Sequence, residues 1–209
     1  IKIAGIGASA LAASALVGSK ATSVSGKAAD LALNTVLIAG TANLANLLDL
    51  RPGRALKATV LVATPLSYFS AAAAKAPAWG ASGAASAMPA ASGVVASETP
   101  AAPSAKSVSP ASASAASAQR LLASGLNAAA ITALVEDLQE TTMLGDTGAN
   151  AAGALLGTSL AANDSWKLRL GAALGVVGLI LASEKVSFSK VIAANPALNW
   201  LDQLWRRPL

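Results

Sequence analysis

One short cluster of charged residues follows an uncharged run and has side chains that suit a phosphate ligand. It contains the carboxylate Asp49 and the cations Arg51, Arg54 and Lys57. Guanidinium and ammonium groups bind phosphate oxygens, and a carboxylate binds a divalent cation. The alternative is structural: a helix stop, a turn at residues 52–53, and cations that anchor the next helix.

Two amides precede this cluster. Asn43 and Asn46 lie in the last turns of the uncharged run, where an unpaired amide facing lipid would be costly. We therefore expect both side chains to face a polar cleft.

A second cluster centres on Asp146, which lies between Gly145 and Gly148. The glycines allow the backbone to turn and to approach a ligand closely, and Asn150 follows one helical turn later. The alternative is a helix cap at Asp146 and Thr147. Downstream, Gly153 and Gly157 have the spacing of a helix-packing seam, and upstream Glu136, Asp137 and Glu140 are interpreted as a solvated helix end.

The composition limits what these clusters could do. Of 209 residues, 54% are hydrophobic and 12% charged, about half the usual charged fraction, and the mean hydropathy is +0.57. This balance favours a membrane protein. There is no histidine or cysteine, so catalysis must depend on carboxylates, lysines, hydroxyls or a metal held by oxygen. The net charge of +5 and 3% aromatic content do not indicate nucleic-acid binding.

The elements that would position the clusters are uncharged runs of near membrane-spanning length. They predict an all-α, polytopic integral membrane bundle of about six transmembrane helices, at residues 3–19, 31–48, 58–74, 121–135, 147–163 and 170–183. The two shortest would need Arg120, Lys167 and Arg169 to extend their side chains toward the headgroups.

Between and after these runs the composition changes. Residues 76–118 are rich in Ala, Ser and Pro, which predicts a long disordered, low-complexity loop. The tail at 184–209 contains Trp200, Trp205, Arg206 and Arg207 and predicts an interfacial segment. The predicted organisation is therefore 1–75 (helices 1–3), 76–118 (loop), 119–183 (helices 4–6) and 184–209 (tail). With six spans, both clusters and the tail share one membrane face.

At these two clusters the sequence resembles the polyprenyl-phosphate N-acetylhexosamine-1-phosphate transferase family, which includes phospho-N-acetylmuramoyl-pentapeptide transferase. The family motif Asn-x-x-Asn-x-x-Asp-Gly-x-Asp-Gly is matched at four positions, and its Gly-Asp-x-Gly motif with a following glycine at four more. The matched residues are Asn43, Asn46, Asp49 and Gly53, then Gly145, Asp146, Gly148 and Gly153. The resemblance is to a divergent member and covers a C-terminal portion of a typical chain, which fits a chain that begins at Ile1.

The resemblance implies a magnesium-dependent phosphotransferase of the bacterial plasma (inner) membrane, active in cell-envelope glycan or peptidoglycan precursor synthesis. It would move a sugar 1-phosphate from a UDP-N-acetylamino sugar to a polyprenyl phosphate at the cytoplasmic face. Asp146 and Asp49 are the expected catalytic residues and Mg²⁺ ligands. The expected substrate-binding residues are Asn43, Asn46, Arg51, Arg54, Lys57 and Asn150, and a homodimer is possible.

The sequence departs from this family at several points, and a second interpretation stays open. Pro52 stands where the family has its second aspartate, and the chain has no Asp-Asp pair. Either the chain is truncated or part of the site has been lost, and loss of the paired aspartates from the complete gene would favour the alternative, a non-catalytic membrane protein of the same fold that binds a lipid carrier or an envelope-assembly partner.

Overall fold

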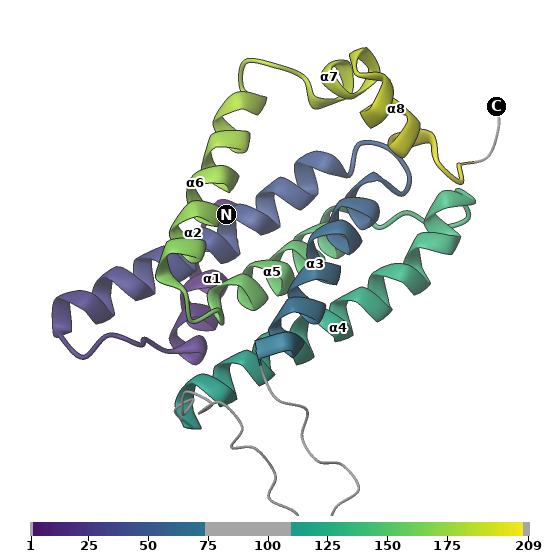
Figure 1. The fold of residues 1–209 in the computed structure, drawn as a ribbon. Coiled ribbons are helices and arrows are strands. Elements are labelled where there is room, and N and C mark those ends of the chain that lie inside the picture. The colour runs from purple at the N-terminus through teal and green to yellow at the C-terminus, as the bar shows by residue number, and fades with distance from the viewer. Residues whose placement is uncertain (1, 74–109, 207–209) are drawn as a thin grey trace, which may run out of the picture.

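The computed structural model describes residues 2–73 and 110–206, and in these residues the chain is helical and contains no strand. The longer helices, α1 to α6, form a bundle, and the two short helices α7 and α8 lie at one end of it (Figure 1). The prediction of an all-α fold is confirmed. The helices are α1 Lys2–Val17, α2 Val24–Leu48, α3 Arg54–Ala73, α4 Pro110–Leu138, α5 Gly145–Ala161, α6 Trp166–Ser183, α7 Phe188–Ala194 and α8 Pro196–Gln203.

The centre of the bundle is the close contact between α2 and α5, which glycines on α5 make possible. A Cβ atom on Gly157 would stand 2.7 Å from the Cα of Ile38 and 2.8 Å from the carbonyl oxygen of Leu37. A Cβ on Gly153 would stand 2.7 Å from the Cα of Ala42. No side chain fits in this space, so the interpretation of these glycines as a packing seam is confirmed.

The other helices surround this pair. Helices α1 and α6 pack on α2, while α3 packs on α4 and both contact α5 (Figure 1). The main core is small and made largely of alanine and leucine, so helix axes can approach closely. Its buried residues are Ala10, Leu37, Ile38, Ala63, Leu126, Leu156, Leu160, Ala161 and Ala173.

All six uncharged runs lie on the first six helices, but one predicted boundary is wrong. Helix α4 begins at Pro110, so residues 110–118 are helical although they were predicted as part of the loop. Residues 111–124 contain many alanines and neither Pro nor Gly, and alanine has the highest helix propensity. The rest of the predicted loop, residues 76–109, lies outside the described residues, as does Arg207 in the tail.

Three of the described helices are long and apolar enough to cross a membrane: α2, the Ala116–Leu138 part of α4, and α6. The apolar part of α1, Gly5–Val17, is shorter, and α5 has 17 residues. The count of six spans is therefore not confirmed. Large apolar side chains stand exposed on the outer helices, such as Leu121 at 75% and Leu174 at 64%. Such surfaces indicate a membrane protein.

A buried ion pair closes the end of the bundle opposite α7 and α8. Arg169 on α6 donates to Asp30 and to Asn34 of α2, both at 2.9 Å, and its side chain is 3% exposed. Arg169 was expected to extend toward the headgroups, and this expectation is wrong. A guanidinium with two acceptors in reach is more stable inside the bundle than an unpaired one near hydrocarbon.

Candidate functional site

The two charged clusters meet at the end of the bundle that carries α7 and α8. There, the loop between α2 and α3 contacts the end of α4 through Gly53 and Asp137, and the C-terminal hairpin, α7 and α8, covers the start of α3 (Figure 1). Both clusters and the described part of the tail therefore lie at one end of the bundle, whereas their sharing of one membrane face stays a prediction.

Asp137 ties the two loops together. Its carboxylate accepts a hydrogen bond from the backbone N–H of Gly53 at 2.6 Å and another from that of Leu144 at 3.2 Å. The residue is 4% exposed, so its interpretation as part of a solvated helix end is wrong. Glu136 and Glu140 do lie exposed at the end of α4. Each oxygen of Asp137 accepts a backbone hydrogen bond, which gives this carboxylate a structural role.

A sequence signal for Asp137 existed. The buried positions of α4 recur every three or four residues, at Ala123, Leu126, Ala130 and Leu134, and the next position in that series is Asp137. A carboxylate on the buried face of an apolar helix needs hydrogen-bond partners nearby, whereas Glu136, one residue earlier, is off that face and Glu140 lies beyond the end of α4.

Asp49 ends α2 and is half-buried beside the start of α5. Burial raises the pKa of the Asp49 carboxyl, and the negative charges of Asp137 and Asp146 raise it further. A hydrogen bond from the backbone of Gly145 acts in the opposite direction on this pKa. Gly145 has φ 63° and opens α5, so the carboxylate of Asp49 lies at the N-terminus of that helix, where negative charge is favoured.

Asp146 lies in the first turn of α5 and is exposed. Its charge acts on Asp49, so the structure brings together the two carboxylates that the sequence analysis selected. The predicted cap at Asp146 and Thr147 is wrong, because both residues lie inside α5 and Leu144 holds the N-cap position. The side chain of Asn150 donates to the backbone oxygen of Asp146 at 2.6 Å.

Two of the three selected cations, Arg54 and Lys57, donate their hydrogen bonds to the C-terminal hairpin. Arg54 donates to both carboxylate oxygens of Asp202, at 2.7 and 3.0 Å, and to the hydroxyl of Ser189 at 2.9 Å. Lys57 donates to the backbone oxygens of Leu201 and Asp202, at 3.1 and 2.7 Å. Both cations are buried, which matches the structural alternative of helix anchoring.

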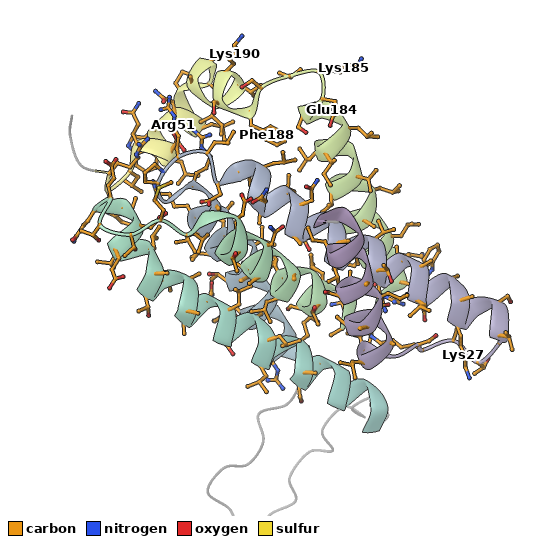
Figure 2. The ribbon with its side chains drawn as sticks, turned by 180° about the vertical axis from the view of Figure 1, so that it is seen from behind. Lys27, Arg51, Glu184, Lys185, Phe188 and Lys190 are labelled. Atoms are coloured by element: carbon orange, nitrogen blue, oxygen red, sulfur yellow. The ribbon has the colours of Figure 1, made fainter. Side chains whose placement is uncertain are left out.

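The partner of these cations, Asp202, was missed by the sequence analysis. The Arg54 hydrogen bonds hold the pKa of Asp202 below its ordinary value despite the opposing effect of burial. Nothing local in the tail indicated this contact, because it depends on how α8 folds back. Arg51 remains exposed at the same end of the bundle, close to the hairpin (Figure 2).

The selected amides lie along the inner helices below this end. Asn43 and Asn46 are partly buried, and the Asn46 Oδ1 has no hydrogen-bond partner among the described residues. Asn150 lines an apolar cavity of about 590 Å³ between α1, α2 and α5, together with the hydroxyl residues Ser9 and Thr158. The Asn150 Oδ1 is buried and also lacks a partner in the described part of the chain.

A metal ion at this site would have few protein ligands. Within residues 2–73 and 110–206, no group of three or more His, Cys, Asp or Glu side chains could hold a metal ion. Asp49 and Asp146 nevertheless fit Mg²⁺, which often binds one or two carboxylates and completes its shell with water and phosphate oxygens. Burial is the main cause that raises the pKa of Asp49, and the charges of Asp137 and Asp146, which add to it, are the part that a cation would offset.

Comparison with known proteins finds no relative of this chain. No protein-family model, no curated protein and no solved structure matches the chain.

Proposed function

We propose that this membrane protein is a phosphotransferase that moves a sugar 1-phosphate from a UDP-N-acetylamino sugar to a polyprenyl phosphate. The observation that supports the proposal is the meeting of Asp49 and Asp146 at one end of an apolar helical bundle. A lipid phosphate and a water-soluble nucleotide sugar can meet only at such a boundary. The bacterial plasma membrane, cell-envelope precursor synthesis and a possible homodimer belong to the same proposal.

Each residue of the site has a role in this reaction. A phosphate oxygen of the lipid attacks the sugar-bound phosphorus of the UDP-sugar, a new P–O bond forms, and UMP leaves. Mg²⁺, bound by Asp146 and Asp49, would neutralise charge on the diphosphate. Arg51, which is exposed at the same end of the bundle, binds phosphate. Asn150 and Asn46 offer hydrogen-bonding groups to the substrate.

Arg54 and Lys57 have a different place in the proposal. Their donors are occupied by the hairpin, so they hold α8 against α3 and support the loop that carries Asp49. Asn43 is partly buried on α2, and we assign it to substrate positioning together with Asn46.

The occupied state of these cations also favours the second candidate function, a non-catalytic lipid-carrier binder or envelope-assembly partner. A transferase that handles two polyanions usually surrounds them with several cations. Here Arg51 is the exposed cation of the first cluster, while Arg54 and Lys57 are buried.

Release of UMP from a UDP-N-acetylamino sugar tests the transferase. The protein is reconstituted in nanodiscs with polyprenyl phosphate, with and without Mg²⁺. We expect Mg²⁺-dependent release that falls by roughly 100-fold or more in Asp146→Asn and Asp49→Asn. Asp164→Asn is the matched control, because Asp164 pairs with Lys20 near the opposite end and its side chain is 45% exposed.

The outcomes separate the two candidates. Release that persists in both Asp146→Asn and Asp49→Asn would refute the assigned site. No release by the folded wild-type protein, together with retention of polyprenyl phosphate in native mass spectrometry, would support the non-catalytic alternative.

A further inference from the structure

The C-terminal hairpin, α7 and α8, lies where a membrane boundary is expected. It follows α6 directly, and the 18 residues of α6 rise about 27 Å, close to the roughly 30 Å of a bilayer's hydrocarbon layer. The ends of α2 and α4 lie at the same end of the bundle (Figure 1). The C-terminal ends of three candidate spans therefore lie toward the end of the bundle that carries the hairpin (Figure 1).

The hairpin buries a carboxylate and exposes tryptophan side chains, whereas a water-facing surface usually exposes carboxylates and buries tryptophans. Its carboxylate Asp202 is 6% exposed and faces Arg54, whereas Trp200 is 65% and Trp205 74% exposed. Val191 is exposed as well. A hairpin that faced water would gain by the opposite arrangement, with apolar groups inside. Exposed tryptophan is typical of the interface between hydrocarbon and headgroups.

The arrangement is fixed by the contacts of the hairpin with α3. Arg54 holds Asp202 and Ser189, and Lys57 holds two backbone oxygens of α8. The carboxylate of Asp202 is therefore on the inner side of the hairpin, paired with Arg54. The outer side carries exposed apolar side chains and cations.

Those cations are Lys185 and Lys190, which point outward from the hairpin in Figure 2. Both are exposed, as is Arg51 on the neighbouring loop. Glu184 is exposed beside Lys185, so basic side chains are in excess on this side. Lysines next to interfacial aromatic residues are the combination that binds anionic lipid surfaces.

We propose that the outer side of this hairpin binds the anionic phospholipid headgroups of the membrane that the bundle crosses. Trp200 and Trp205 insert at the level of the headgroups, and Lys185 and Lys190 contact lipid phosphates. The contact is independent of the transferase reaction, because none of these side chains belongs to the carboxylate site.

Tryptophan quenching by brominated lipids tests the proposal. In a variant with Trp79→Phe and Trp166→Phe, the remaining emission comes from the hairpin. The protein is placed in nanodiscs of one mixed composition, phosphatidylcholine with a minor share of phosphatidylglycerol. In one arm the anionic lipid carries bromine, and in the other an equal amount of the zwitterionic lipid carries it.

We expect stronger quenching when the anionic lipid is brominated, with local enrichment of about fivefold for each lysine. Lys185→Gln with Lys190→Gln should remove the difference between the two arms. Lys27→Gln is the control, because Lys27 is exposed at the far end of the bundle (Figure 2) and should leave the difference unchanged.

Equal quenching in both arms for the protein with intact lysines would refute binding of anionic headgroups. If neither brominated lipid quenches the tryptophan emission, the hairpin faces water or a protein partner, and the proposal is overturned entirely.

Discussion

Replacing Asp137 should separate the two loops that form the candidate site. Its carboxylate accepts the N–H groups of Gly53 and Leu144, at 2.6 and 3.2 Å, in a position that is 4% exposed. Asp137→Ala leaves both donors without an acceptor. An unsatisfied buried donor costs about 1–3 kcal/mol, so two of them predict a loss of about 2–6 kcal/mol in unfolding free energy.

Asp137→Asn should cost less, for two physical reasons. The amide keeps one acceptor oxygen, so one of the two hydrogen bonds survives. Removing the charge also takes away one of the carboxylates that raise the pKa of Asp49, which relieves repulsion at neutral pH. We expect a loss of about 1–3 kcal/mol for this variant.

Unfolding in mixed detergent micelles, followed by tryptophan fluorescence, measures these losses. Glu136→Ala is the matched control, since it removes a neighbouring exposed carboxylate and should change stability by about 0.5 kcal/mol or less. Spin labels at Leu50 and Met143, which are 67% and 78% exposed, should show a broader distance distribution in Asp137→Ala. A stability equal to that of Glu136→Ala, with an unchanged distance distribution, would refute the role of Asp137.

Two further predictions concern packing and pH. Gly157→Ala should destabilise the bundle by about 1–3 kcal/mol, because its Cβ would stand 2.7 Å from the Cα of Ile38. Gly175→Ala, where a Cβ meets nothing within 4 Å, should instead stabilise α6 by about 0.5–1 kcal/mol; equal effects in denaturant melts would contradict the packing argument. The pKa of Asp202 is lowered by Arg54, so its stabilisation is complete above the ordinary value of 3.8 and is lost as the pH falls through the lowered pKa. Unfolding midpoints measured from neutral to acid pH should therefore fall less steeply in Asp202→Asn, and an identical acid dependence would contradict this linkage.

Most of the fold was predictable from the sequence because charge is so rare in it. Six uncharged runs mark six helices, and the glycines at 153 and 157 mark the closest helix contact. Composition could not fix the number of spans, because alanine favours helix in water as well as in lipid. It also could not reveal that Arg169 turns inward, since Asp30 and Asn34 lie on a helix far away in the sequence.

The candidate site was predictable where its residues act locally. Asp49 stands before a loop that contains Gly53, Asp146 follows Gly145 at the start of α5, and the structure brings the two carboxylates together. The assignment of Arg54 and Lys57 depended on a tail whose fold has no local signal, so the carboxylate that binds Arg54 could not be foreseen. Asp137 was missed although its helical spacing places it on the buried face of α4; only its two partners, which are backbone N–H groups, could not be read from residue types.

The electrostatics of this end of the bundle favour a functional explanation for Asp49. Asp202 is stabilised by Arg54, and Asp137 by two backbone N–H groups. Asp49 is different, because burial and neighbouring carboxylates outweigh the Gly145 hydrogen bond and raise its pKa. Carboxylates held in unfavourable surroundings are typical of sites that bind a cation or perform chemistry, and this cost is the physical reason to test Asp49 and Asp146 as a pair.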